Sequence, residues 1–393
     1  MLKKNPFLLF VLLWVGLSGA AQAAGPKNLI LFIGDGMGPQ QVAAAGMFAN
    51  GRAGSLSFES FPYRVEVTTY SADSNITDSA AAATAIATGR KVNNGVLSVA
   101  VPGDGQPLFT LLEYFKINDK STGLVTTTFM THATPAAFAA HQPSRGNLPQ
   151  IADNYFRNSR PTVLFGGGHD DFNPAKAKAA GYMVVTNLAE LQNINTETAR
   201  MVTGVFGNGH LPFEVDGLGE LPHLSQMVDM ALKILADDPE GFFLMVEGGR
   251  IDHAGHNNDI LRNIHETLEF DRTVARAVNW ARDRKDTLVL VTADHETGGL
   301  KVLKNNGKDT PPQVSWSTKE HTDTMVGLYG WGVNAKLLKH AKDNTDIFAI
   351  ATTDTPFFVM FSRGQAVAVV IVALMLAALI IKLISQRDKQ APQ

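Results

Sequence analysis

The amino-acid sequence predicts an α/β protein with a doubly wound, mostly parallel central sheet and helices on both of its faces. Several short apolar runs lack the polar–apolar alternation of half-exposed strands, which is typical of strands covered on both faces. Helical stretches fall between these runs, and that order favours a parallel sheet. Acidic and histidine residues follow several of the runs, and open α/β sheets bind ligands beyond the carboxyl ends of their strands.

The predicted strands are the apolar runs at residues 28–33, 123–127, 162–165, 241–246 and 287–291. The predicted helices lie between them. Residues 79–87 are rich in alanine, the best helix former. Residues 225–236 and 260–284 have apolar side chains at helical spacing, as expected for helices that cover a sheet.

The N-terminal stretch has the three parts of a secretory signal. Lys3 and Lys4 precede an apolar run at residues 7–17, and the stretch ends with Ala21-Gln22-Ala23. This order predicts a signal peptide over residues 1–23. A membrane anchor is the alternative interpretation, and the apolar run is short for one.

The C-terminal end contains a second apolar segment. Residues 366–381 carry no charged side chain, and the ammonium group of Lys382 can extend toward water. With its flanks, this segment approaches the roughly 20 residues that span a membrane, so we expect a transmembrane helix over residues 364–384. The basic residues beyond it predict a cytoplasmic tail over residues 385–393. A buried core helix is the alternative.

These ends predict a domain over residues 24–362 on the periplasmic, extracytoplasmic side of the cell membrane, held there by a single-pass anchor. The whole chain has a net charge of −3, and both ends are basic, so the domain itself is more acidic. A nucleic-acid-binding surface would be basic, and none is expected here. The chain has no cysteine, so its stability outside the cytoplasm must come from its core and from bound metals.

The densest group of metal-binding residue types lies at residues 247–256. Asp252 and His256 are four residues apart, so one helical turn places them on the same face. A carboxylate and an imidazole suit zinc, whereas the oxygen ligand Glu247 better suits magnesium. A purely structural role for this stretch is the alternative.

Two further strand ends carry ligand-type residues. The run at residues 287–291 leads to Asp294 and His295, for which a capped turn is the alternative interpretation. Asp35 follows the first run in a glycine-rich turn that has neither the dinucleotide fingerprint nor the lysine of a phosphate-binding loop. We interpret Asp35 as a ligand that bridges two metals.

Ser79 begins the alanine-rich helix. A helix N-terminus offers free N–H groups and the positive end of a dipole, which favour a phosphate group. A serine at this position beside a zinc ion could attack phosphorus. The alternative is a plain helix cap made by Thr77 or Asp78.

Six segments between residue 27 and about residue 325 resemble, in the same order, the motifs of the alkaline phosphatase family. They are the Asp35 turn, Thr77-Asp78-Ser79-Ala80, His132-Ala133-Thr134-Pro135, residues 247–256, Thr292-Ala293-Asp294-His295-Glu296-Thr297-Gly298-Gly299 and Glu320-His321-Thr322. The resemblance implies a metal-dependent phosphomonoesterase that acts on small phosphate monoesters and releases inorganic phosphate. It also implies a homodimer, the usual assembly of the family, although no motif demonstrates one.

The resemblance also implies a role for each matching residue. Ser79 is the nucleophile that becomes phosphoserine, and Arg145 holds the phosphate oxygens. Two Zn²⁺ ions and a third ion, usually Mg²⁺, complete the site. The first zinc is bound by Asp252, His256 and His321, the second by Asp35, Asp294 and His295, and the third ion by Asp35, Thr134 and Glu247.

The chain departs from the best-known bacterial members at two positions. His132 and His253 stand where those members carry Asp and Lys, a pattern that looks more like the animal enzymes and some marine or cold-adapted bacterial ones. His132 is therefore a candidate ligand of the third ion. His253 is either a participant in the site or a histidine that supports it.

The chain is also short for the family. Only 25 residues separate His295 from His321, which leaves little room for the large insert that crowns longer members and predicts an open site. Two other functions compete with the monoesterase. One is a phosphodiesterase, sulfatase or phosphonate hydrolase on the same metal scaffold, and the other is a membrane-tethered protein that captures phosphate or metal without catalysis.

Overall fold

A nine-stranded sheet forms the centre of the protein, in the order β2-β13-β8-β1-β7-β3-β4-β6-β5. We describe it from a computed structural model, which covers residues 26–353. The predicted signal peptide, transmembrane helix and cytoplasmic tail, and the last residues of the predicted domain, lie outside this range. Within the described range, no helix combines the length and the apolar character needed to cross a membrane.

The strands of this sheet are β1 (Asn28–Gly34), β2 (Tyr63–Val67), β3 (Ser121–Phe129), β4 (Val163–Gly168), β5 (Met183–Val185), β6 (Val202–Asn208), β7 (Phe242–Gly248), β8 (Thr287–Ala293) and β13 (Val326–Gly332). Two small antiparallel pairs lie outside it: β9 (Glu296–Thr297) with β12 (His321–Thr322), and β10 (Leu300–Lys304) with β11 (Gln313–Trp316).

The predicted mostly parallel sheet is confirmed. All five predicted strands are present, as β1, β3, β4, β7 and β8, and they are neighbours in the sheet with parallel pairing throughout. Every residue of β1, β7 and β8 is buried, which explains why their sequences show no alternation. Antiparallel pairing in this sheet is confined to the two pairs that β13 makes, with β8 and with the edge strand β2.

The α-helices are α2 (Pro39–Asn50), α3 (Ser79–Thr88), α4 (Leu111–Ile117), α5 (Ala133–Ala139), α6 (Leu148–Asp153), α7 (Pro174–Ala179), α8 (Leu188–Gln192), α9 (Leu224–Leu235), α10 (Arg250–His256), α11 (Ile260–Ala281) and α12 (Asp346–Thr352). Short helical turns are η1 (Ser57–Ser60), η2 (Asn154–Ser159), η3 (Glu214–Asp216) and η4 (Ala335–His340).

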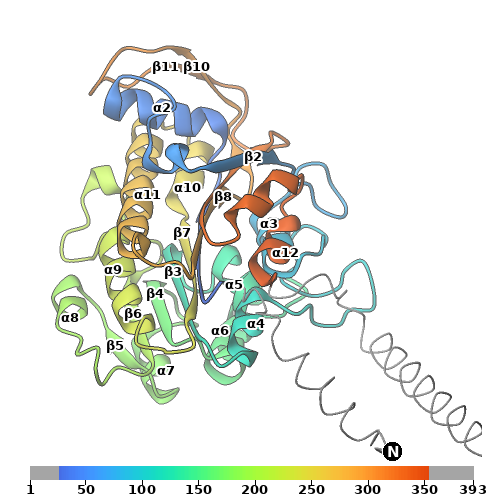
Figure 1. The fold of residues 1–393 in the computed structure, drawn as a ribbon, viewed down its shortest axis with the longest axis vertical. Helices are drawn as coiled ribbons and strands as arrows, with labels where there is room; N and C mark the ends of the chain where they lie inside the picture. Colours follow the sequence, from blue (N-terminus) through green and yellow to red (C-terminus); the bar gives the residue numbers. More distant parts are fainter. Residues whose placement is uncertain (1–25, 354–393) are drawn as a thin grey trace, which may run out of the picture. The chain divides into compact units, whose positions relative to one another are not determined.

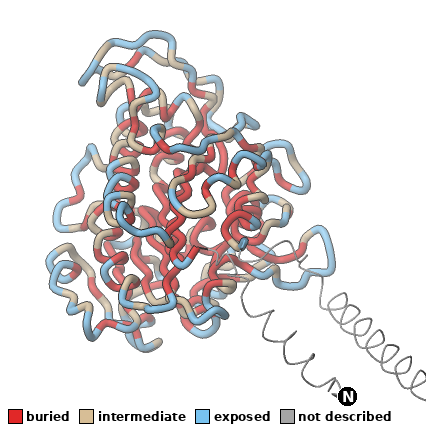
Figure 2. Tube along the Cα trace, in the orientation of Figure 1, coloured by how far each residue is buried: buried red, intermediate tan, exposed pale blue. Residues whose placement is uncertain are grey.

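Helices cover both faces of the sheet, as predicted. Figure 1 shows α9 and α11 on one side and α3, α4, α5 and α12 on the other. The first group contacts β1, β3, β4, β7 and β8, and α4 and α5 contact β3 and β7 from the opposite side. Buried residues fill the space between these layers, and exposed residues gather in the outer loops (Figure 2).

The register of the three central strands positions their carboxyl ends together. Gly34, the last residue of β1, pairs with Gly248 of β7 and with Ala293 of β8. Residues far apart in the chain therefore leave the sheet at the same level of the same edge. Apolar packing holds this arrangement, for example where Phe32 of β1 meets Phe270 of α11 edge to face at 5.8 Å between ring centroids.

Candidate active site

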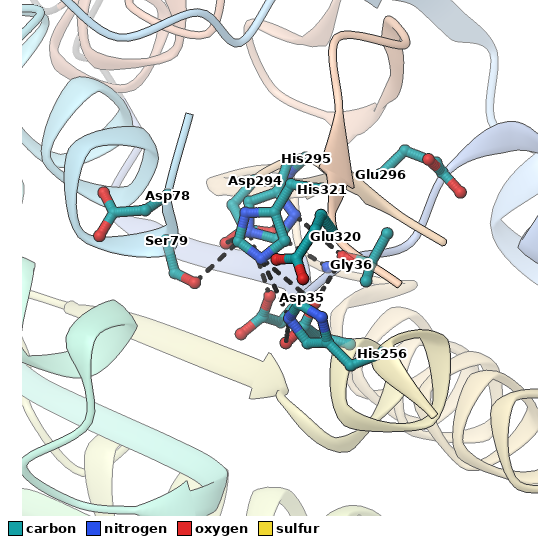
Figure 3. A network of polar contacts seen from close by, with 12 residues as sticks. Asp35, Gly36, Asp78, Ser79, His256, Asp294, His295, Glu296, Glu320 and His321 are labelled. Carbon is teal, nitrogen blue, oxygen red and sulfur yellow. Dashed lines mark hydrogen bonds and ion pairs between the residues drawn. The ribbon is translucent and has the colours of Figure 1, made fainter. Parts of the chain in front are cut away.

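The carboxyl edge of the sheet gathers the acidic residues that the sequence singled out. Asp35 directly follows β1, Glu247 is the penultimate residue of β7, and Asp294 directly follows β8. All three side chains have no exposed surface. The backbone N–H of Gly36 donates to Asp294 Oδ1 at 3.1 Å and ties the first turn to the third strand end (Figure 3).

Helix α10 adds the next pair of ligand-type residues. Asp252 and His256 lie on one helical turn, as their spacing predicts, with 3.3 Å between Asp252 Oδ2 and His256 Nε2. The turn after β1 approaches this helix closely. Gly36 has φ +71°, and a Cβ there would lie 2.8 Å from the Cα of Asp252, so a side chain would not fit.

Ser79 and Asp78 have separate functions at the start of α3. Asp78 is the N-cap, and its Oδ1 accepts a hydrogen bond from Ala81 N at 2.9 Å. The Ser79 hydroxyl is therefore not needed for capping. Ser79 Oγ lies 3.4 Å from His295 Nε2, at the dipole end of the helix that favours anions (Figure 3).

The first ligand group consists of Asp252, His256 and His321, whose ligand atoms all lie within 4.8 Å of one another. His256 Nδ1 donates to the carbonyl of Lys319, and His321 Nδ1 donates to the carbonyl of Thr77 at 2.9 Å. Because carbonyls only accept, each Nδ1 carries a proton, and in the neutral ring that binds a metal each Nε2 presents a lone pair. The two Nε2 atoms are 3.2 Å apart, and a shared cation would satisfy both lone pairs.

The second ligand group consists of Asp35, Asp294 and His295, all fully buried. His295 Nε2 lies 3.2 Å from Asp294 Oδ2 and 3.6 Å from Asp35 Oδ1. Both carboxylate oxygens of Asp35 and Oδ2 of Asp294 have no hydrogen-bond donor. Buried carboxylate oxygens without donors are costly unless a cation faces them.

The third ligand group consists of Asp35, His132 and Glu247. Glu247 Oε2 accepts hydrogen bonds from the hydroxyls of Thr126 and Thr128, but its Oε1 has no donor. Thr134 Oγ1 is also buried without a partner. The structure therefore brings His132 to the group that the sequence predicted as Asp35, Thr134 and Glu247.

The crowding of negative charge makes this arrangement favourable for binding cations. Burial, followed by the charges of Asp294 and Asp252, holds the pKa of the Asp35 carboxyl well above its ordinary range. Burial likewise raises the pKa of Glu247 to about 7, against the opposing hydrogen bond from Thr126. Divalent cations would keep these carboxylates ionised. The nitrogen and oxygen donors of the first two groups suit zinc, and the oxygen-rich third group suits magnesium.

Arg145 lies between the N-terminus of α3 and the third ligand group. Its Nη1 donates to Asp78 Oδ2 at 3.0 Å, and its Nη2 donates to His132 Nε2 at 3.3 Å. The guanidinium therefore links the cap of the Ser79 helix to the third ligand group. Its planar fork of donors suits the oxygens of a phosphate group.

His253 belongs to none of the four groups of possible metal ligands found within residues 26–353, the fourth being Glu214, His223 and Glu269. Arg250 Nη1 donates to His253 Nδ1 at 2.8 Å, so Nδ1 accepts and Nε2 carries the proton of the neutral ring. The Arg250 guanidinium itself stacks over Phe213, 3.8 Å from the ring centroid. His253 is thus an oriented imidazole beside the ligand groups, 6.0 Å from His132 between ring centroids.

Sequence reasoning missed three residues of this region: Arg250, His210 and His169. The ring of His210 lies 4.4 Å from that of His253, and the ring of His169 lies beside Phe129. His169 directly follows β4 and His210 comes two residues after β6. The rule that ligands gather beyond strand ends would have found both, had the full length of β4 and the presence of β6 been predicted.

Comparison with known proteins gives a consistent result. Residues 26–354 match the family model described as Alkaline phosphatase. The chain is 40% identical over 294 residues to Alkaline phosphatase 3 of Bacillus subtilis, which covers 70% of this chain and 62% of the relative. It is 35% identical over 348 residues to Alkaline phosphatase 4 of the same organism, and this match covers 82% of this chain and 71% of the relative. The chain thus spans about two thirds of the length of these relatives.

Solved structures show the same likeness. The alkaline phosphatase from the Antarctic bacterium TAB5 has a TM-score of 0.75 and 28% sequence identity, and the match covers 86% of this chain and 100% of that one. A histidine-to-aspartate variant of that enzyme has Mg bound in the site called M3.

Proposed function

The chain belongs to the alkaline phosphatase family, and from this we propose that it hydrolyses phosphate monoesters through a phosphoserine intermediate on Ser79 and releases inorganic phosphate. One observation carries the proposal. The Ser79 hydroxyl, at a helix N-terminus, lies 3.4 Å from His295 of the second ligand group, and Arg145 links the cap of that helix to His132 of the third. Phosphoryl transfer needs this combination of a positioned nucleophile and neutralised charge.

Three cations would be held by the residues described above. One zinc would bind Asp252, His256 and His321, and the other Asp35, Asp294 and His295. A magnesium would bind Asp35, Thr134 and Glu247, with His132 as an imidazole ligand. When bound, these ions would stabilise the charge on the entering and leaving oxygens and lower the pKa of the nucleophile.

The protein's own residues carry the remaining steps. Arg145 donates to two phosphoryl oxygens and, with the N–H groups at the start of α3, orients phosphorus toward Ser79. Ser79 Oγ gives up its proton to solvent and forms a bond to phosphorus, while the bond from phosphorus to the ester oxygen breaks and that oxygen leaves with the electron pair and takes up a proton from solvent. Water then loses a proton and attacks phosphorus from the side of the departed group, the bond from phosphorus to Ser79 Oγ breaks, and Oγ takes up a proton as phosphate leaves.

Turnover of two chromogenic esters tests the proposal. The full chain, supplied with zinc and magnesium near pH 9, should release p-nitrophenol rapidly from p-nitrophenyl phosphate and far more slowly from bis-p-nitrophenyl phosphate. Chelation should abolish both reactions. Faster cleavage of the bis-ester would show that the protein is a diesterase and not a monoesterase. Cleavage of neither ester by a folded, metal-loaded chain would favour a protein that captures phosphate without catalysis.

We further propose that this domain works on the periplasmic side of the cell membrane as a homodimer, anchored by residues 364–384. The support is the signal-like stretch at residues 1–23 and the uncharged C-terminal run in the sequence. Protease added to intact spheroplasts should remove the domain from membrane-bound protein. A domain that is cleaved only after the membrane is broken would contradict this location.

A further inference from the structure

Arg145 sits on an irregular segment between α5 and α6, so contacts from outside that segment must fix its position. The backbone provides some of them. Arg145 N donates to the carbonyl of Gly95 at 2.7 Å, and Leu97 and Gln142 exchange two backbone hydrogen bonds of 2.9 Å each. Residues 95–98 therefore lie alongside the segment that carries Arg145.

Residues 95–98 are in turn attached to the helix of the nucleophile. Gly95 N donates to Asp78 Oδ1 at 3.0 Å, on the same carboxylate that binds the Arg145 side chain. Ser98 N donates to Thr84 Oγ1 at 2.9 Å, one turn and a half further along α3. Residues 95–98 are thus hydrogen-bonded to the start and body of α3 on one side and to the Arg145 segment on the other.

His141 connects residues 95–98 to α4 through one hydrogen bond from each ring nitrogen. Its Nδ1 is 2.8 Å from the carbonyl of Ser98, and its Nε2 is 2.9 Å from Glu113 Oε1. The other oxygen of Glu113 accepts from Thr110 N at 2.9 Å in the capping box of α4. A carbonyl and an ionised carboxylate only accept hydrogen bonds, so both ring nitrogens of His141 donate and the ring is an imidazolium.

We propose that His141, held as an imidazolium between Ser98 and Glu113, is a positioning residue that fixes the Arg145 segment relative to the N-terminus of α3. This inference rests on the proposed function, in which Arg145 binds the phosphoryl oxygens. His141 touches neither those oxygens nor any ligand residue. Its effect passes through the backbone of residues 95–98 and 142–145, and the expected consequence is on phosphate affinity.

The charges around His141 are consistent with its protonated state. Burial alone would lower the pKa of the His141 ring, but the hydrogen bonds to Glu113 and Ser98 and the charge of Glu113 together raise it above its ordinary value. Lys116 is the other charged residue beside the ring along α4, and its ammonium donates to the carbonyls of Asn158 and Ser159. Asn154, which contacts the His141 backbone from η2, is neutral.

The raised pKa fixes the sign of the pH dependence. The contact is fully formed when His141 is protonated, and it is lost as the pH rises through the raised pKa of the folded protein. Above that pH the ring keeps one N–H donor for two acceptors, the carbonyl of Ser98 and the carboxylate of Glu113. Removing the charge of Glu113 should therefore change how phosphate affinity depends on pH.

Calorimetric titration of the full, zinc- and magnesium-loaded chain with inorganic phosphate tests the inference. His141→Gln should bind phosphate about tenfold more weakly than wild type at neutral pH, the loss expected when a charge-assisted hydrogen bond no longer holds the arginine segment. His223→Gln is the matched control, because it removes another His–Glu pair, with Glu214 at 2.7 Å, away from the Arg145 segment. Its affinity should not change.

Glu113→Gln provides a second variant that keeps the fold. Glutamine can replace glutamate in a capping box, and with its single oxygen on Thr110 N its uncharged NH2 group faces His141 Nε2. A neutral His141 ring accepts from this NH2 group and still donates to Ser98, so phosphate affinity in this variant should not fall at the pH where wild type loses the contact. Equal phosphate affinity in His141→Gln and wild type, or an unshifted pH dependence in Glu113→Gln, would overturn the inference.

The same titration separates the two proposals. Because it measures binding without turnover, a wild-type chain that binds phosphate but cleaves no ester would overturn the proposed function alone, and the affinity ratios would still decide the role of His141. A wild-type chain that binds no phosphate would overturn both.

Discussion

Several side chains of this site are oriented by hydrogen bonds to groups that are not candidate metal ligands. His256 and His321 use Nδ1 on backbone carbonyls and present Nε2, and Thr297 Oγ1 donates to Asp252 Oδ1. Asp78 takes the capping function and leaves the Ser79 hydroxyl available. These hydrogen bonds orient His256, His321 and Asp252, which reduces the reorganisation needed when substrate binds.

Removal of His321 tests the assignment of the first ligand group. His321→Ala should retain about one zinc ion fewer per chain than wild type and lose on the order of 10³-fold in kcat, because several kcal/mol of charge stabilisation is removed. Metal content is measured by mass spectrometry after gel filtration. His340→Ala, at an exposed histidine, is the control. Full zinc content in His321→Ala would contradict the assignment.

Some residues of the site could be predicted from their local sequence and others could not. Asp252 and His256 share one helical turn, and Asp294 follows a wholly buried, mostly apolar strand, so spacing indicated the first two and position after a strand indicated the third. Arg250 gave no such signal, because its contacts are to His253 and to Phe213, which lies many residues earlier in the chain. The approach of His132 to Asp35 and Glu247 likewise depends on tertiary packing.

At the scale of elements, α11 carries a buried carboxyl whose titration opposes folding. Glu266 is 4% exposed, and its Oε1 accepts from Glu214 N at 2.7 Å. Burial raises the pKa of Glu266 to about 8. Because the pKa is higher in the folded state than in the unfolded state, this residue contributes stability at acidic pH that is lost as the pH rises through about 8.

Glu266→Gln should therefore weaken the pH dependence of stability. The amide keeps the hydrogen bond to Glu214 N and does not titrate. Between pH 5 and 9 the variant should gain on the order of a few kcal/mol in unfolding free energy relative to wild type, as measured by urea denaturation. Parallel stability curves for the two proteins over this range would show that Glu266 is ionised in the folded state.

The segment between His295 and His321 bears on substrate size. It contains only the two-stranded pair β10–β11 and the short strand β9, with no helix. If the site is open, kcat/KM for a phosphorylated peptide should lie within about tenfold of that for p-nitrophenyl phosphate, a difference of about 1.4 kcal/mol. Discrimination of several hundredfold against the peptide would indicate a covered site.

The strands that could be predicted from the sequence are those that are fully buried in the sheet. The central strands β1, β7 and β8 are buried on both faces and read as plain apolar runs. The edge strand β2 is largely exposed, and β13 alternates between buried and partly exposed residues in a glycine-rich sequence, so neither was predicted. Both lie on the antiparallel side of the sheet, where strand identity depends on pairing more than on local composition.

At the scale of the whole molecule, the parallel register of the sheet brings the residues of the site together. It places residues from the first, middle and last parts of the described chain at one edge, where they form the ligand groups. The crowded carboxylates repel one another in the absence of cations. Bound metals should therefore contribute to the stability of the whole domain.

Removal of the metals should destabilise the folded protein. At a free metal concentration about 1,000 times Kd, one bound ion stabilises the folded state by about 4 kcal/mol. Chelation should thus lower Tm by several degrees or more in differential scanning calorimetry, and zinc with magnesium should restore it. An unchanged Tm after verified metal removal would mean that the ligand groups do not bind metal in the folded state.

Acid quenching during turnover tests the central claim most directly. The full chain is mixed with p-nitrophenyl phosphate, quenched in acid, digested and examined by mass spectrometry for phosphopeptides. We predict one phosphate on the peptide that contains Ser79, and none in Ser79→Ala, which should also lose turnover. Sustained turnover with no phosphate on Ser79, or with phosphate on another residue, would contradict the assignment of Ser79 as the nucleophile at the metal-binding edge of the sheet.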